Sequence, residues 1–347
     1  MAFSLCFNGL LMRIFAYFAC HGAFSLGQGT SEQQPLLEEG SFASVTDVIE
    51  EEFTLSDGRS LGVAHFGAEN GSPVFYFHGY PGCRLSGGAF FDRAGKRLGA
   101  KIIAIDRPGI GNSSPQPGRE LLDFASDVHE LAEHLKLKSY GIIGVSGGGP
   151  YALACARTLS PERLKAVSII GGMGPIGVGF KGMSWGNWLT FVGLMYFPWI
   201  IRLLQKKVVS VLNTTPNEQV IKQIEGKVTE RTAKFVGSDV MYLLDPDRMA
   251  TMLDLYREHY KQGIEGYMED GRVMTTDWGF YLKDIPEKVS VQLWYSKKDT
   301  NVPFQMGEAI RSRLSSPPEF HVDEDATHLQ LVLKCSGSAL ERLLEKI

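Results

Sequence analysis

The sequence predicts an α/β protein: a mostly parallel β-sheet with helices on both faces and a helical cap insertion. Short, mostly apolar runs alternate with segments whose apolar residues recur at helical spacing. Strands of a parallel sheet are buried on both faces, so they read as continuous apolar runs. Between about residues 174 and 287 the strand pattern stops and the apolar spacing becomes mostly helical. We therefore divide the chain into a core of residues 46–173 and 288–347 and a cap of residues 174–287.

The core elements follow in a regular order. The first two strands alternate polar and apolar residues and are joined by a Ser-Asp-Gly turn, which predicts an antiparallel pair. Later strands are mostly apolar and alternate with segments of helical period. The strand at 140–145 is uncharged and rich in β-branched residues. The expected strands are 51–55, 61–66, 73–78, 101–105, 140–145, 164–170, 289–295 and 319–322, and the expected helices are 90–98, 120–135, one from 150, 306–314 and one ending near 347.

Composition is consistent with this class. The 347 residues are 44% hydrophobic and 21% charged, which suits one large domain with a sizeable core. The net charge of −4 gives no reason to expect a nucleic-acid partner. The five cysteines are widely scattered, and no Cys or His has metal-ligand spacing, so we expect neither a disulfide framework nor a metal site.

Residues 1–45 differ from the rest of the chain. In residues 1–26 only Arg13 and His21 can carry a charge, and a mostly polar linker follows. The apolar stretch is typical of a signal peptide, or of an uncleaved anchor if read as one span. We therefore expect a secretory or membrane-associated protein, with membrane contact through residues 1–26, and keep a cytoplasmic location as the alternative.

The cap contains a run of twenty uncharged residues, Gly182 to Ile201. Such a run could cross a membrane, but two glycines, an asparagine and a proline interrupt it and three cations follow closely. A helical cap over the carboxyl end of the sheet explains the apolarity better, because its inner face would line a pocket. We assign Trp185, Trp188 and Phe191 to that pocket wall, while simple packing of two helices would account for much of the same pattern.

The segment from Tyr140 to Cys155 contains the central motif. A buried strand passes into an Ala- and Leu-rich helix through Gly144-Val145-Ser146-Gly147-Gly148, the pattern of a nucleophile elbow. A strand can enter a helix within about five residues only through a cramped turn, where glycine is tolerated because it lacks a Cβ. This turn would expose the hydroxyl of Ser146 at a helix N-terminus, which favours developing negative charge.

A serine needs a base and an acid to become a nucleophile. In parallel α/β sheets ligands collect beyond the carboxyl ends of the strands, so candidates should follow strands. Asp299 follows the strand at 289–295, and His328 follows the strand at 319–322. We therefore expect a triad of Ser146, Asp299 and His328. Asp323 and Asp325 lie nearer to His328 in sequence, but sequence proximity does not provide the geometry.

Attack on a carbonyl also needs hydrogen-bond donors for the oxyanion. The backbone N–H of Gly147 follows the nucleophile, and that of Tyr80 lies in the loop His78-Gly79-Tyr80-Pro81-Gly82, directly after a strand. We expect these two N–H groups to form the oxyanion hole, and Tyr80 and Val145 to contact substrate. His78 itself is expected to hydrogen-bond loop backbone.

These motifs resemble the α/β-hydrolase superfamily, in particular its cap-bearing serine hydrolase branch. The resemblance rests on His78 to Gly82, Asp106 to Gly111, Gly144 to Gly149, Asp299 to Pro303 and His328. It covers about residues 48–347 and implies an eight-stranded, mostly parallel sheet and a reaction without a cofactor. Ser296 and Thr327 stand where loops of that family often carry glycine.

The identity of the nucleophile narrows the expected chemistry. Relatives with a similar His-Gly-x-Pro loop that open epoxides use an aspartate at the elbow, because attack of a serine on saturated carbon would leave a stable ether. Ser146 therefore favours acyl transfer, and the apolar cap favours a hydrophobic small-molecule ester as substrate. Hydrolysis of amide, thioester, lactone or carbon–carbon bonds by the same triad, a membrane-tethered lipase and a ligand receptor remain alternatives.

Overall fold

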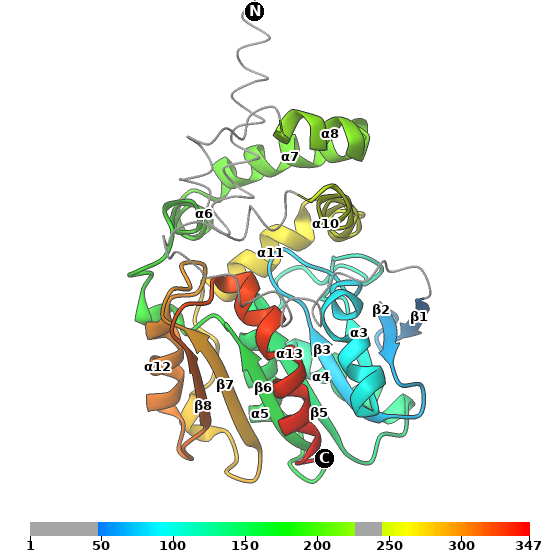
Figure 1. Cartoon of the computed structure of the whole chain (residues 1–347), viewed down its shortest axis with the longest axis vertical. Helices are drawn as coiled ribbons and strands as arrows, with labels where there is room; N and C mark the ends of the chain where they lie inside the picture. The colour runs from blue at the N-terminus through cyan, green and yellow to red at the C-terminus, as the bar shows by residue number, and fades with distance from the viewer. Residues whose placement is uncertain (1–47, 226–244) are drawn as a thin grey trace, which may run out of the picture.

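The computed structural model describes residues 48–225 and 245–347. The expected signal peptide or anchor at residues 1–26 and the linker after it lie outside these described residues. Within them, an eight-stranded sheet forms the centre and helices cover both of its faces (Figure 1). The expected fold class is confirmed, including the sheet of eight strands.

The sheet has the strand order β1-β2-β4-β3-β5-β6-β7-β8. Strand β2 pairs antiparallel with both β1 and β4, and the remaining neighbours are parallel. All loops that follow the parallel strands therefore leave the sheet at one edge. The strands are β1 Ile49–Thr54, β2 Ser60–Gly67, β3 Ser72–Phe77, β4 Ala100–Ile105, β5 Tyr140–Val145, β6 Leu164–Ile170, β7 Ser290–Ser296 and β8 Glu319–Asp323.

The hydrophobic core lies in two layers, one on each face of the sheet. Successive residues of β3 alternate between them: Phe75 and Phe77 belong to one cluster, and Val74 and Tyr76 belong to the other. Helices α3 and α13 pack on the second layer, while α4, α5 and α12 cover the first. Their bounds are α3 Ser86–Leu98, α4 Asp123–His134, α5 Gly149–Thr158, α12 Phe304–Arg313 and α13 His328–Leu344.

Helix α3 begins at Ser86, four residues before the expected start at Phe90. The added turn contains Gly87 and Gly88, and glycine is a poor helix former, so the sequence pattern excluded it. The structure gives the reason for these glycines. A Cβ at Gly88 would lie 2.3 Å from Cε1 of Phe66 on β2. The helix can therefore approach the sheet closely only because these side chains are missing.

The inserted region contributes helices above the loop-bearing edge of the sheet (Figure 1). They are α6 Trp185–Tyr196, α7 Pro198–Thr214, α8 Asn217–Glu225, α10 Pro246–His259 and α11 Glu265–Met274, and we call them the cap helices. The uncharged run 182–201 is divided between α6 and α7 at Phe197. Across 48–225 and 245–347, no helix has both the length and the apolarity required to span a bilayer.

Candidate active site

Ser146 sits at the turn between β5 and α5. Its φ angle is +53°, a left-handed conformation that is uncommon for a residue with a side chain. The neighbouring glycines allow this turn, because a Cβ at Gly144 would lie 2.6 Å from the carbonyl oxygen of Gly148. A Cβ at Gly148 would lie 2.2 Å from the carbonyl oxygen of Phe77 on β3. The cramped turn that the sequence predicted is present.

Asp299 and His328 meet beyond the ends of β7 and β8. His328 Nδ1 lies 2.6 Å from Asp299 Oδ2, and the Asp299 carboxylate is inaccessible to solvent. Its other oxygen, Oδ1, accepts hydrogen bonds from the N–H groups of Asn301 at 2.8 Å and Val302 at 2.9 Å. A carboxylate can only accept, so Nδ1 carries the proton and the lone pair of the neutral ring lies on Nε2. An imidazole held this way can take a proton from a hydroxyl.

Two loop residues that departed from the family pattern hold this pair in place. The Ser296 hydroxyl donates to the carbonyl of Ala326 at 2.5 Å and so ties the loop after β7 to the loop after β8. Thr327 caps α13 in a reciprocal arrangement with Gln330. These hydrogen bonds fix the start of α13, and His328 is its first residue. Ser296 and Thr327, which stand where the family often has glycine, thus add hydrogen bonds between the two loops and at the start of α13.

Gly171, directly after β6, lies behind the imidazole and was not singled out from the sequence. It has a φ of +53°, and a Cβ there would lie 3.0 Å from His328 Cε1 and 3.4 Å from Asp299 Oδ2. A single glycine at the end of a strand carries no distinctive motif. The close approach becomes visible only when β6 and β7 are paired in the sheet.

Ser146 and His328 line one cavity with a volume of about 170 Å³ beneath the cap helices. Three of the expected substrate-binding residues also line it: Tyr80, Val145 and Phe191. Trp185 and Trp188 do not, because the face of α6 that carries Asn187 and Phe191 turns inward while these two indoles are exposed. The structure therefore does not place the two tryptophans in the pocket wall. The helical phase, which the sequence left open, decides this.

The orientation of the Gly79–Tyr80 peptide is fixed through its carbonyl. The Gly79 oxygen accepts from Arg107 Nη2 at 2.9 Å and from His78 Nδ1 at 2.9 Å. The N–H of a trans peptide points away from its carbonyl, so the Tyr80 N–H faces away from Arg107. Gly147 lies next to this peptide, since a Cβ there would lie 3.2 Å from Tyr80 N. The two expected oxyanion donors are therefore close neighbours.

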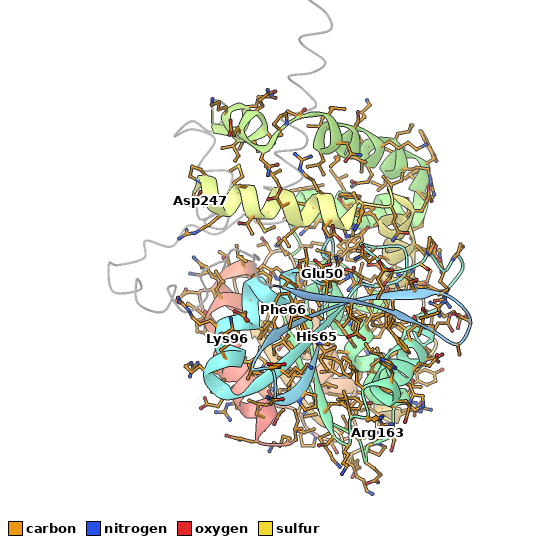
Figure 2. The ribbon with its side chains drawn as sticks, turned by 90° about the vertical axis from the view of Figure 1, so that its right-hand side faces the viewer. Glu50, His65, Phe66, Lys96, Arg163 and Asp247 are labelled. Carbon is orange, nitrogen blue, oxygen red and sulfur yellow. The ribbon has the colours of Figure 1, made fainter. Side chains whose placement is uncertain are left out.

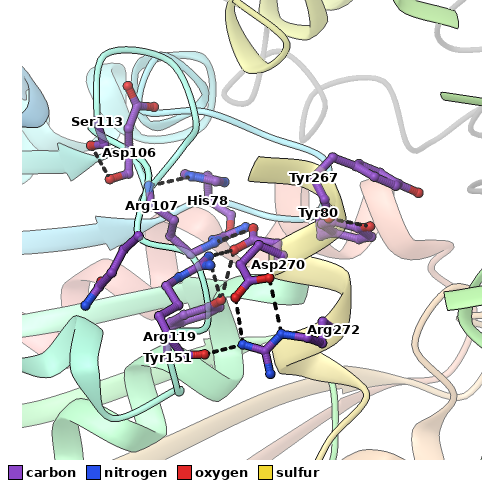
Figure 3. Close-up of polar contacts among 12 residues, drawn as sticks. His78, Tyr80, Asp106, Arg107, Ser113, Arg119, Tyr151, Tyr267, Asp270 and Arg272 are labelled. Atoms are coloured by element: carbon purple, nitrogen blue, oxygen red, sulfur yellow. Dashed lines mark hydrogen bonds and ion pairs between the residues drawn. The ribbon is translucent and has the colours of Figure 1, made fainter. Parts of the chain in front are cut away.

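A buried ion cluster holds Arg107 (Figure 3). Arg107 Nε donates to Asp270 Oδ2 of α11 at 2.7 Å, and Arg119 and the Tyr151 hydroxyl donate to Oδ1. Burial alone would raise the pKa of Asp270, but Arg107 and Arg119 outweigh it and hold that pKa below its ordinary value. Asp270 is therefore a carboxylate. It stands in a helical segment without any motif, so sequence reasoning missed it.

The loop from His78 to Arg84 is also bonded to the cap helices. The Tyr80 ring stacks on Tyr267 of α11 at 4.5 Å between centroids, and its hydroxyl donates to the Tyr267 carbonyl at 3.1 Å. His259 of α10 donates from Nδ1 to the Gly82 carbonyl at 2.7 Å. This loop therefore depends on residues from α10 and α11 as well as on the core.

Arg84 connects the same loop to the edge of the sheet. Its guanidinium bonds the Asp106 carboxylate at 2.6 Å, Glu258 of α10 at 2.7 Å and also Glu50 of β1. Figure 2 shows α10 crossing above the edge of the sheet where Glu50 lies. The Asp106-Arg107-Pro motif thus supplies one residue that anchors Arg84 and another that orients the Tyr80 peptide.

Two histidines near this loop are buried and neutral. Burial lowers the pKa of His78 well below its ordinary value, and Arg107 adds to the effect. Burial lowers the pKa of His259 to about 4. His78 Nε2 accepts from the Arg107 N–H at 3.3 Å, so both ring nitrogens of His78 bond loop backbone, as expected from the sequence. In the described part of the chain no cluster of three or more His, Cys, Asp or Glu side chains could hold a metal ion.

Comparison with known proteins gives one family. The model of the alpha/beta hydrolase fold family matches residues 72–334. A non-heme chloroperoxidase from Streptomyces lividans is 34% identical over 127 residues, which are 35% of this chain and 45% of that protein. A proline iminopeptidase from Arabidopsis thaliana is 31% identical over 122 residues, which are 34% of this chain and 31% of that protein. The chain thus matches less than half the length of these curated relatives.

Among solved structures, an epoxide hydrolase from Vigna radiata superposes with a TM-score of 0.60 at 16% identity. The match covers 88% of this chain and 100% of that chain. At this identity the likeness concerns the fold alone. The relatives carry out different reactions on one scaffold, so the site must be used to choose among them.

Proposed function

The chain belongs to the α/β-hydrolase fold family, and from this premise we propose that it is a serine hydrolase that cleaves a carboxylic ester of a hydrophobic small molecule. The observation that carries the proposal is the pair of His328 Nδ1 and Asp299 Oδ2 at 2.6 Å, with His328 and Ser146 lining one cavity. We further propose that residues 174–287 act as the cap of this cavity.

In the proposed mechanism His328 accepts the proton of Ser146 as the hydroxyl attacks the ester carbonyl. The N–H groups of Tyr80 and Gly147 stabilise the oxyanion, each contributing about 3–4 kcal/mol to the transition state. His328 then protonates the departing alcohol and activates water against the acyl-enzyme. Asp299 keeps the imidazole in the required tautomer throughout. Apart from the ester and water, these steps use only residues of the chain.

Two features favour an ester over the substrates of the relatives. A serine that opened an epoxide would form an ether that water does not cleave, so Ser146 supports acyl transfer. A peptide with a charged amino terminus would require a carboxylate in the pocket. Among the described residues that line the cavity there is no Asp or Glu, and most are apolar or aromatic. Such a wall favours a neutral acyl or alcohol group, at about 0.8 kcal/mol for each buried CH₂.

The test is labelling of the full chain with a fluorophosphonate, mass-spectrometric mapping of the modified residue, and turnover of p-nitrophenyl esters. We expect modification at Ser146 and loss of turnover in Ser146→Ala. Ser86 also lines the cavity, so Ser86→Ala is the matched control and should keep the label. A folded chain that is unlabelled at Ser146 would refute the proposed nucleophile.

Additional assays separate the alternatives. A chain that binds esters without turning them over would be a receptor. Faster turnover of anilides or lactones than of esters would identify amide or lactone hydrolysis by the same residues. Fractionation of the chain with and without residues 1–26 would test tethering to a membrane and secretion.

A further inference from the structure

The outer surface of α6 and α7 carries large apolar side chains in contact with solvent. Six of these residues are at least half exposed: Trp185, Leu189, Tyr196, Phe197, Trp199 and Leu203. We call them the cap patch. Exposed apolar side chains that occur singly are ordinary, but a contiguous set on one element marks an interaction surface.

The spacing of these residues places them on one outward face of each helix. On α6, Trp185, Leu189 and Tyr196 recur four and seven residues apart, so they share one helical face. The opposite face carries Asn187 and Phe191, which line the cavity. On α7, Trp199 and Leu203 are four residues apart and continue the patch from the corner at Phe197. Helix α6 is thus apolar on both faces, although only one of them is buried among residues 48–225 and 245–347.

Cations border the patch on the side of α7. Lys206 and Lys207 follow Leu203 by three and four residues, which places both next to it on the helix surface, and both are exposed. Between Lys181 and Glu218 the sequence contains no acidic residue. Arg202, on the same helix, is paired with Glu265 of α11. The border on α7 therefore has a positive charge.

We propose that the cap patch docks the protein on the surface of an anionic lipid bilayer. Trp and Tyr prefer the boundary between headgroups and acyl chains, where the ring is buried and its polar atom stays hydrated. Lysines next to them reach the lipid phosphates, and each contributes about 1 kcal/mol at an anionic surface. The charge of the border favours this occupant, because it contains lysines and no acidic residue between Lys181 and Glu218 and so complements an anionic lipid surface.

Docking through this face would also set the position of the cavity. Since α6 presents the cap patch on one face and lines the cavity with the other, the bilayer would lie against the helix that closes the site. The proposal does not depend on Ser146 acting as a nucleophile, because vesicle binding can be measured on the Ser146→Ala protein as well.

The test is co-sedimentation of the full chain with vesicles of phosphatidylcholine alone and of phosphatidylcholine with phosphatidylserine. We expect tighter binding to the anionic vesicles. The variant Tyr196→Ser/Trp199→Ser/Leu203→Ser should bind them at least about tenfold more weakly. Replacing Lys206 and Lys207 by Gln should weaken binding about fivefold for each lysine and lower its salt sensitivity.

The matched control is Tyr281→Ser, which removes an equally exposed aromatic residue next to η3 (Leu282–Asp284), outside the cap helices. It should bind as the wild type does, and circular dichroism should show that every variant is folded. The proposal is overturned if the triple variant binds like the wild type, since another segment such as residues 1–26 would then bind the lipid. Failure of the wild type to bind either vesicle also overturns it. So does a lipid-free dimer that the triple variant dissociates in light scattering, because a second copy would then cover the patch.

Discussion

Arg107 and Asp270 form a fully buried ion pair with 2.7 Å between Nε and Oδ2. Arg107 follows β4 in the core, whereas Asp270 belongs to cap helix α11. The same guanidinium donates to the carbonyl of Gly79, whose peptide carries the N–H of Tyr80. Asp270 of α11 is therefore linked through Arg107 to the peptide that carries the Tyr80 N–H, a proposed oxyanion donor.

Replacing Asp270 by Asn should impair both stability and turnover. The loss of charge leaves Arg107 and Arg119 buried without a counter-ion, which should lower the free energy of unfolding by about 3–5 kcal/mol. With Arg107 less firmly held, the Tyr80 N–H should be less well oriented. We expect kcat to fall by at least about tenfold with little change in KM, because the oxyanion exists only in the transition state. Urea unfolding and steady-state kinetics measure the two effects.

Two further variants make this result interpretable. Glu269→Gln changes the neighbouring acid, which pairs with Arg272 rather than Arg107, and should leave kcat unchanged. Tyr151→Phe removes one hydroxyl from Asp270 Oδ1 and keeps the ion pair, so it should fold even if Asp270→Asn does not. A smaller fall in kcat is expected for it. If kcat is unchanged in Tyr151→Phe, and in Asp270→Asn where that variant folds, the ion cluster only stabilises the fold.

Asp299→Asn should lower kcat by about 10³–10⁴-fold, because an amide can hold the wrong tautomer of His328. Asp325→Asn is the matched control. Asp325 lies three residues before His328, but its carboxylate pairs with Lys298 at the surface. We expect ester turnover of this control to match that of the wild type. If the two asparagine variants had equal activity, Asp299 would not be the acid that orients the imidazole.

The sequence predicted those features of the fold and of the site that depend on local residue patterns. Strand β6 has the predicted bounds Leu164–Ile170, because a mostly apolar run that has Lys165 as its one charged residue and that ends at two glycines is typical of a buried strand. The elbow at Ser146 was predictable because the tight turn from strand to helix leaves no room for a Cβ at Gly144 or Gly148. Strand endings also predicted that Asp299 and His328 would meet, since parallel strands end at one edge of the sheet.

Features that depend on packing between distant segments were not predictable. Asp270 becomes significant only when α11 is laid against the loop after β4, and no spacing encodes that contact. The outward direction of Trp185 and Trp188 depends on the rotation of α6 about its axis. An apolar helix with no polar face gives the sequence no means of fixing this rotation.

Gly171→Ala tests the support behind the imidazole. The new methyl group would lie 3.0 Å from His328 Cε1, and alanine at a φ of +53° costs about 1–2 kcal/mol. We expect kcat to fall about tenfold or more as the ring is displaced. Gly99→Ala is matched for backbone strain, with a φ of +71° and no atom within 4 Å of the added Cβ. It should lower the Tm of thermal unfolding about as much as Gly171→Ala does, but leave kcat unchanged. If Gly171→Ala and Gly99→Ala had equal kcat, the His328 imidazole would accommodate the added methyl group without loss of activity.

Stability should fall in mild acid because of His259. Its pKa is about 4 in the folded protein, below its ordinary 6.5, so the unfolded chain binds a proton that the folded protein excludes. The stability due to neutral His259 is therefore complete above about pH 6.5 and is lost as the pH falls toward 4. At pH 5 the loss amounts to about 2 kcal/mol. His78, whose pKa is also lowered, adds a loss of the same sign.

Urea unfolding at pH 7 and pH 5 measures this loss, and His259→Asn isolates the contribution of one ring. An asparagine amide can still donate to the Gly82 carbonyl but does not titrate. The difference in unfolding free energy between the two pH values should therefore be about 2 kcal/mol smaller in His259→Asn than in the wild type. His129→Asn, at an exposed histidine of α4, controls for the loss of an imidazole. Identical pH dependence in the wild type and His259→Asn would mean that water reaches this ring, and that the contact between α10 and the loop at Gly82 opens in the folded protein.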